Sequence, residues 1–389
     1  MIQDPNVSFL HRARLLLVII SIILPILFLI YKFTHPTLSP YQEVSTAVTT
    51  QNPSLGLETI EINKMLPLRG TTKEIIINTQ GNLAYVAAYG QGVHTLSLEK
   101  PLAPVVLSSF KYNDRYDGVI KLKLSKDEKS LYVLDEKKGV YSLDVRDPST
   151  SKLIDFIAIP NGQSMTLSSS GHKIYISGKF GLGIININQD GMFALLGRLH
   201  YLSGKKTYTM EKFLPHQQYN MLKEIADVVE VDANTLYLMS RHPDVVDVSD
   251  LSNIKVITHF STLGFGRQAT ISGNRQRMYL SSGDSGIEIF DISDYKSPRP
   301  LGGHNTESSA GHTSISKDKN ILYVSTCKGG LQVFDITYPY DPKLIKRVDI
   351  KKDVKKGHAI TSALSRDEKV LYIAYGVSGL GIVSFEQTK

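Results

Sequence analysis

The sequence has no tryptophan and only one cysteine, Cys327, among its 389 residues. A single cysteine excludes an intramolecular disulfide and a zinc site built from cysteines. A block of like charge is also missing, because the net charge of +7 comes from Lys and Arg spread along the chain. Without a basic block, or basic residues interleaved with stacking aromatics, nucleic acid is not an expected partner.

One long apolar segment is present near the N-terminus. Residues 15–31 read LLLVIISIILPILFLIY without a charge, and as a helix they would extend about 25 Å, the short end of a membrane span. Arg12 and Arg14 precede the segment and Lys32 follows it, so cationic side chains can reach the headgroups on both sides. The sequence therefore predicts a cytoplasmic N-terminus (residues 1–14) and a transmembrane signal anchor (residues 15–32).

A cleaved signal peptide is the alternative for the same segment. The apolar run is longer than a usual signal-peptide core, and no small-x-small cleavage site follows it. The excess of positive charge before the segment favours a single pass through the inner (cytoplasmic) membrane, with the C-terminal domain in the periplasm or outside the cell. Residues 33–55 are rich in Pro, Ser, Thr and Gln, which predicts a linker.

Residues 56–389 repeat one unit seven times. Each copy has a strand with a tyrosine between apolar residues, a polar turn and a second strand, as in SLYVLDEKKGVYSLDV from Ser130. The tyrosines are Tyr85, Tyr132, Tyr175, Tyr237, Tyr279, Tyr323 and Tyr372. They are 42 to 49 residues apart, except for a gap of 62 between the third and the fourth. Such a period is typical of propellers and solenoids.

Two further positions recur in the unit. Five copies place a glycine seven residues after the tyrosine, which suits a hairpin turn with positive φ: Gly92, Gly139, Gly286, Gly330 and Gly379. Five residues beyond that position stand short side chains able to bond a following turn: Ser97, Asp144, Asn186, Asp247, Asp291, Asp335 and Ser384. An alternating segment before the tyrosine strand and another strand at the end give four strands per unit.

Four-stranded antiparallel sheets repeated radially close into a propeller. The sequence predicts an all-β fold, a seven-bladed β-propeller, and the lack of tryptophan argues against WD-type and quinone-cofactor propellers. The last copy stops after its third strand, while GLETIEINKMLPLRG from Gly56 reads like a third and fourth strand alone. We therefore expect the two ends of the chain to share the final blade, with either Leu57–Ile62 or Met65–Arg69 as its outer edge.

The strands IEIFDI, LQVFDI and VYSLDV carry an apolar-apolar-Asp pattern. In this pattern the chain resembles the LVIVD repeat family over roughly residues 56–389. The resemblance implies a bacterial propeller in the periplasm or at the cell surface, and it brings no catalytic motif. The first, third and seventh copies depart from the pattern with Ser or Asn in place of Asp, which a turn tolerates and a metal ligand would not.

Polar residues precede each predicted innermost strand, where loops gather at the mouth of a central channel. They are Lys73, Asp117, Gln163, Glu224, Arg267, His312 and His358. One interpretation is a polar ligand or an ion held by four of them from adjacent blades, Glu224, Arg267, His312 and His358. The other is a solvated channel in which any polar residue serves. Asp117, Glu224 and the histidines are the ones that could converge on a metal in a lactonase-like hydrolase.

The long gap before the fourth copy indicates an insertion near Tyr201 to Leu222. It suggests a partner-binding loop, with Tyr201, Lys205, Lys206, Tyr208, Phe213, His216 and Tyr219 as contact residues. The alternative is a plain surface loop with room for a short helix. We expect a protein-interaction or ligand-binding platform without catalysis, cofactor or metal, and we keep the metal-dependent hydrolase as the alternative.

Overall fold

The computed structural model describes residues 58–62, 64–112, 117–202, 207–211, 224–318, 320–328, 330–349 and 357–385. The described residues belong to one compact unit, residues 50–389, and the predicted anchor and linker lie outside the described residues. Within the described ranges, no helix is long and apolar enough to cross a membrane.

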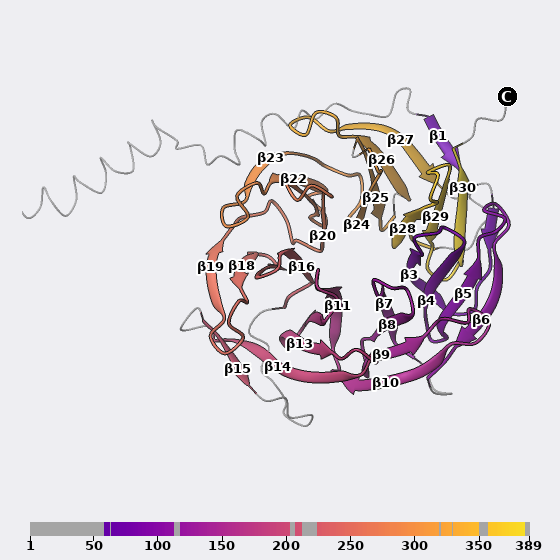
Figure 1. Cartoon of the computed structure of the whole chain (residues 1–389). Helices are drawn as coiled ribbons and strands as arrows, with labels where there is room; N and C mark the ends of the chain where they lie inside the picture. The colour runs from indigo at the N-terminus through magenta and orange to yellow at the C-terminus, as the bar shows by residue number, and fades with distance from the viewer. Residues whose placement is uncertain are drawn as a thin grey trace, which may run out of the picture. The chain divides into compact units, whose positions relative to one another are not determined.

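Seven antiparallel sheets surround a central axis, as predicted (Figure 1). Blade 1 holds β3 (Thr71–Ile77), β4 (Leu83–Tyr89), β5 (Gly92–Ser97) and β6 (Val105–Phe110); blade 2 holds β7 (Val119–Leu124), β8 (Ser130–Asp135), β9 (Gly139–Asp144) and β10 (Lys152–Ala158). Blade 3 holds β11 (Gly162–Leu167), β12 (Lys173–Gly178), β13 (Gly181–Ile187), β14 (Phe193–Leu202) and β15 (Thr207–Glu211). Blade 4 holds β16 (Asp227–Asp232), β17 (Thr235–Met239), β18 (Asp244–Asp247) and β19 (Lys255–His259).

The remaining blades include the first strands of the chain. Blade 5 holds β20 (Gln268–Ile271), β21 (Arg277–Ser281), β22 (Ile287–Asp291) and β23 (Arg299–His304). Blade 6 holds β24 (Ala310–Ile315), β25 (Ile321–Thr326), β26 (Leu331–Asp335) and β27 (Lys343–Asp349), and β1 (Glu58–Glu61) pairs with β27 in parallel. Blade 7 holds β28 (Thr361–Leu364), β29 (Val370–Ala374), β30 (Leu380–Ser384) and β2 (Lys64–Leu66).

The ring closes through β2, which pairs antiparallel with β30 as the outer strand of blade 7. Of the two segments that the sequence offered for this edge, the second supplies it. The turn glycines show that β2 is equivalent to the other outer strands. A Cβ on Gly139 would lie 2.1 Å from the Ile157 carbonyl oxygen of β10, and one on Gly379 would lie 2.3 Å from that of Leu66 in β2. Both glycines also have positive φ, as predicted.

The seven repeat tyrosines are all buried and lie in equivalent second strands. In two of them the hydroxyl group bonds to the next blade: Tyr237 donates to the Tyr295 carbonyl oxygen at 2.7 Å, and Tyr372 donates to that of Pro101 at 2.9 Å. Burial raises the pKa of the Tyr372 phenol to about 12. These tyrosines join the apolar clusters between blades, which explains why the residue recurs once per blade.

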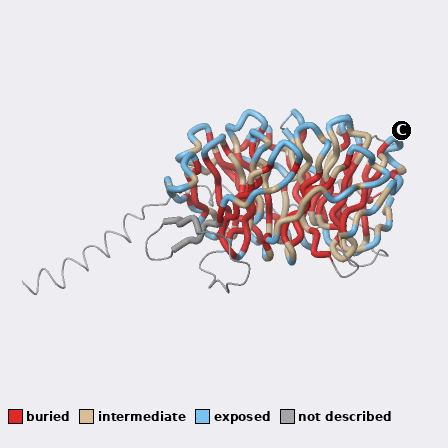
Figure 2. Tube along the Cα trace, turned by 60° about the horizontal axis from the view of Figure 1, so that its bottom comes forward, coloured by how far each residue is buried: buried red, intermediate tan, exposed pale blue. Residues whose placement is uncertain are grey.

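The turns and connectors at the two ends of the strands form two rims, and buried residues fill the middle of the propeller between these rims (Figure 2). At one rim, the first strand of a blade turns into the second and the third turns into the outer strand; we call this rim the turn face. At the other, the second strand turns into the third and the outer strand leads to the next blade; we call it the connector face. Predicted side-chain bonds hold the turn face, since Asp291 accepts the Ser293 N–H and Asp335 accepts the Thr337 N–H, both at 2.9 Å.

Candidate functional site

One residue of each innermost strand forms a ring around the central axis of the seven sheets. Within the innermost strand, this residue lies two positions before the one that pairs with the repeat tyrosine of the same blade. The ring consists of Glu74, Lys121, Ser164, Asp227, Gln268, His312 and Thr361. Only His312 belongs to the set that the sequence suggested.

Ring residues bond to the next blade. Glu74 accepts the Leu122 N–H, Asp227 accepts the Ala269 N–H at 3.0 Å, and Gln268 accepts the Thr313 N–H at 2.8 Å. In each pair, the acceptor belongs to one blade and the amide to the innermost strand of the following blade. These side chains satisfy edge amides that would otherwise lack a partner, so much of the ring polarity is structural.

The ring also contains an ion pair and a buried histidine. The Lys121 ammonium lies 3.3 Å from the Glu74 carboxylate. The His312 Nδ1 atom is enclosed and has no hydrogen-bond partner in the structure. Burial, together with the positive charges of Lys121 and Lys123, holds the pKa of this imidazole well below its usual value, so His312 is neutral near pH 7.

The other residues suggested at the channel mouth lie before the ring. Lys73, Gln163 and Arg267 precede it by one position, Glu224 and His358 by three, and Asp117 by four. Two of them meet, because the Gln163 amide donates to the Glu224 carboxylate at 2.5 Å.

Asp117 and Lys73 have different surroundings. Asp117 is buried, pairs with the Lys138 ammonium and accepts the Tyr112 N–H at 3.0 Å. The Lys73 ammonium lies 5.4 Å from the centre of the Tyr89 ring. Asp117 is thus bound within a connector, whereas Lys73 lies beside an aromatic ring.

The geometry does not favour the hydrolase alternative. In the part of the chain that the structure describes, no three or more His, Cys, Asp or Glu residues are grouped so that they could hold a metal ion. Asp117, one of the suggested ligands, is already neutralised by Lys138.

The insertion before blade 4 begins with a hairpin. Residues 207–211 form β15, which pairs with β14 at the outer edge of blade 3, and Tyr201 is the register partner of Tyr208. The interpretation of this part as a loop or helix was wrong, because TYTME has the β-branched and aromatic composition of a strand. β15 also lies next to β19 of blade 4. Lys205, Lys206, Phe213, His216 and Tyr219 lie outside the described residues.

The sequence analysis missed a set of connector contacts. In the third strand of each blade, one residue pairs with the repeat tyrosine. In three blades, the residue just before it contacts the connector that leads into the blade from the preceding one. His94 bonds the Arg69 carbonyl oxygen at 2.8 Å, Tyr141 lies 4.5 Å from Tyr112 between ring centres, and Glu288 accepts the Leu263 N–H at 3.0 Å. The only available signal was a polar or aromatic residue inside an otherwise apolar strand.

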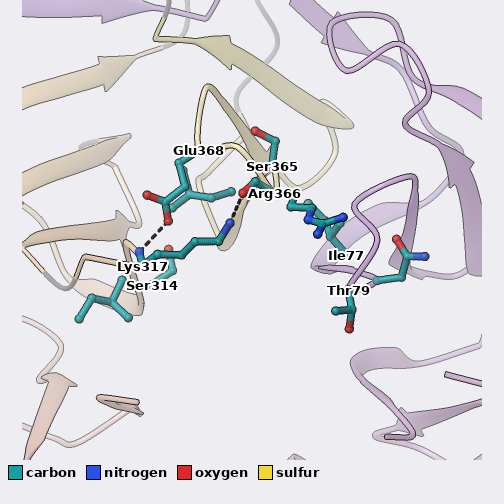
Figure 3. Close-up of a pocket in the computed structure, with 10 residues that line it drawn as sticks. Ile77, Thr79, Ser314, Lys317, Ser365, Arg366 and Glu368 are labelled. Atoms are coloured by element: carbon teal, nitrogen blue, oxygen red, sulfur yellow. Dashed lines mark hydrogen bonds between the residues drawn. The ribbon is translucent and has the colours of Figure 1, made fainter. Parts of the chain in front are cut away.

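At the turn face, a pocket of 490 Å³ opens between blades 1, 6 and 7 (Figure 3). Its lining comes from the ends of three innermost strands and from the turns that follow them. This pocket was also missed, because the sequence pointed to the opposite end of the channel.

No family model matches the chain, and no curated protein is similar to it in sequence. Among solved structures, the β-propeller domain of Cps50 (Swd1) from Myceliophteria thermophila has a TM-score of 0.64 at 12% identity and covers 84% of this chain and 99% of that chain. The C-terminal WD40 domain of Sif2 has a TM-score of 0.60 at 12% identity and covers 85% and 99%. A protein from Lactobacillus plantarum has a TM-score of 0.58 at 17% identity and covers 73% and 84%. At these identities the likeness shows the fold alone, a β-propeller.

Proposed function

We propose that the protein is a membrane-anchored, extracytoplasmic β-propeller that binds a protein partner or ligand through its connector face, without catalysis. The observation that carries this proposal is the insertion between blades 3 and 4. A repeat fold buries its core with four strands per blade, so a hairpin and a long connector added at one place serve something beyond folding.

Two features of the sequence support the cellular setting. The uncharged run of residues 15–31 has the composition of a membrane span, with more positive charge before it than after it. The apolar-apolar-Asp strands support membership in the LVIVD repeat family. On this proposal, residues 33–55 tether the propeller to the outer side of the membrane.

Capture of the partner from an envelope extract tests the binding surface. The full chain is compared with a Tyr201→Ser/Tyr208→Ser variant and with a control, Tyr338→Ser/Tyr340→Ser. The control pair lies in a turn-face loop and is 75% and 68% exposed. We expect the first variant to retain less than about one fifth of the partner, and the control to retain all of it, because aromatic side chains dominate interface energies. Equal retention by both variants would contradict the proposal.

The anchor has its own test. The full chain should stay in the membrane pellet after alkaline carbonate extraction, and a chain lacking residues 1–33 should be released. An external protease should cleave the propeller only when the outer side of the membrane is accessible. Release of the full chain by carbonate would exclude the anchor but leave the partner test unaffected.

A further inference from the structure

The pocket at the turn face has an apolar floor. Ile77, Ile315 and Leu364 occupy the same register position in blades 1, 6 and 7, one residue past the partner of the blade tyrosine. All three are half-buried, so part of each side chain faces the opening. A volume of 490 Å³ lies in the range that small-molecule sites occupy.

Two cations stand at the edge of this floor. Lys317 and Arg366 hold equivalent positions in the turns of blades 6 and 7, and both are exposed. The Lys317 ammonium donates to the Arg366 carbonyl oxygen, and the Arg366 guanidinium lies 3.5 Å from the Gln80 carbonyl oxygen. Among the ion pairs of the described residues, neither cation has a carboxylate partner.

The carboxylate that lines the pocket, that of Glu368, is engaged in another contact. Glu368 accepts the Lys317 backbone N–H at 2.6 Å, as Figure 3 shows. This contact is a recurring link between blades, because Glu128 accepts the Thr79 N–H at 2.7 Å and Glu230 accepts the Ser169 N–H at 2.5 Å. Each glutamate therefore joins its own blade to the turn of the preceding blade, and the two cations are left to face the opening.

We propose that this pocket binds a small amphiphile with a single anionic headgroup, a carboxylate or a phosphate. The headgroup accepts charge-assisted hydrogen bonds from Arg366 and Lys317, which suit planar or tetrahedral oxyanions. The apolar part lies on Ile77, Ile315 and Leu364, where it removes half-exposed aliphatic surface from water. This site is at the opposite end of the channel from the connector face and goes beyond the function proposed above.

The repeat provides a matched control. Lys126 occupies the same turn position in blade 2 as Arg366 does in blade 7, and each packs against the glycine of the next turn, Gly171 and Gly81 respectively. Lys126 does not line the pocket. Lys126→Gln removes one positive charge from the turn face, as Arg366→Gln does, but it leaves the lining of the pocket unchanged.

The test is calorimetric titration of the full chain in lipid nanodiscs, corrected with empty nanodiscs. The probes are n-hexyl phosphate, inorganic phosphate and hexanol. We expect saturable binding of hexyl phosphate, weaker binding of inorganic phosphate and no binding of hexanol. Arg366→Gln should weaken hexyl phosphate binding at least about tenfold, the loss of one charge-assisted contact, and Lys126→Gln should change it less than twofold.

Three results would overturn the proposal. They are the absence of saturable binding, equal weakening by the two glutamine variants, and inorganic phosphate binding as tightly as hexyl phosphate. The second result would mean general attraction to a cationic surface, and the third would mean that the floor contributes nothing. Partner capture with Arg366→Gln separates this site from the connector face, since the variant should retain the partner fully.

Discussion

The two faces of the propeller are built differently. On the turn face, one hydrogen bond recurs in six blades. A side-chain oxygen accepts the backbone N–H of the residue five positions later, at 2.9 to 3.0 Å. The accepting residues are Asn78, Ser125, Ser168, Ser272, Ser316 and Ser365. On the connector face, one position of the third strand contacts the incoming connector, but its side chain differs from blade to blade. It is His94 in blade 1, Tyr141 in blade 2 and Glu288 in blade 5. The turn face repeats the same stabilising contact in most blades, whereas the connector face uses different residues in different blades. A binding site specific to one place in the ring can therefore arise on the connector face without loss of a repeated contact.

The largest effect should come from a connector contact. Glu288→Leu removes the acceptor of the Leu263 N–H and of the Ser282 hydroxyl and leaves both without a partner. Because Glu288 is 2% exposed, we expect a loss of about 3 kcal/mol in the free energy of unfolding. Urea unfolding followed by circular dichroism measures it. A loss below about 1 kcal/mol would show that connectors are held without this contact.

The next effect depends on pH. The His312 pKa is lowered in the folded protein, while the unfolded chain takes up the proton near pH 6.5. The free energy of unfolding should therefore fall as the pH drops below 6.5, by at most about 1.4 kcal/mol per pH unit. His312→Gln should remove this part of the slope between pH 6.5 and 5.5. Parallel curves for the two proteins would mean that His312 binds a proton equally in both states.

The turn face should respond uniformly. Ser316→Ala and Ser365→Ala remove the same two hydrogen bonds in equivalent turns, one accepted from the N–H of Ile321 or Val370 and one donated to Asp318 or Asp367. We expect each to cost about 1 kcal/mol, with a difference below about 0.5 kcal/mol. Differential scanning calorimetry on both variants compares them. A clear difference between the two would break the equivalence of the turns.

The smallest effect should come from Gln332, the residue of blade 6 that corresponds to Glu288. Gln332 is 1% exposed, and neither of its amide atoms has a hydrogen-bond partner in the structure. Gln332→Leu should change the free energy of unfolding by less than about 0.5 kcal/mol or raise it, because nothing bonded is lost. A loss near that of Glu288→Leu would reveal a bond that this side chain makes in solution.

The fold could be predicted because its determinants recur in every unit. A tyrosine and a turn-capping residue mark equivalent strands in all seven units, a turn glycine marks five of them, and the departure of the last copy from four strands indicated closure by the N-terminal segment. Which segment closes the ring depends on pairing at the edge. Both candidates have strand composition, and both are used, β1 beside blade 6 and β2 in blade 7.

The site was harder to predict for a local reason. In blades 1, 2, 3 and 6 the innermost strand carries a bulge one residue before the ring position, at Lys73, Ile120, Gln163 and Gly311. A bulge of this kind has no signature in an isolated sequence. The ring residues Glu74 and Ser164 were missed while their polar neighbours Lys73 and Gln163 were selected, whereas in blade 6 the selected polar residue, His312, is itself the ring residue. The turn-face pocket needs three blades, which no single segment reveals.

Lysine-directed cross-linking of the captured partner, followed by mass spectrometry, tests the central claim that the connector face binds. Exposed lysines mark both faces, with Lys137 and Lys328 on the connector face and Lys126, Lys129 and Lys369 on the turn face. The account predicts partner cross-links to the first pair and none to the second set. Cross-links confined to Lys126, Lys129 or Lys369 would contradict it.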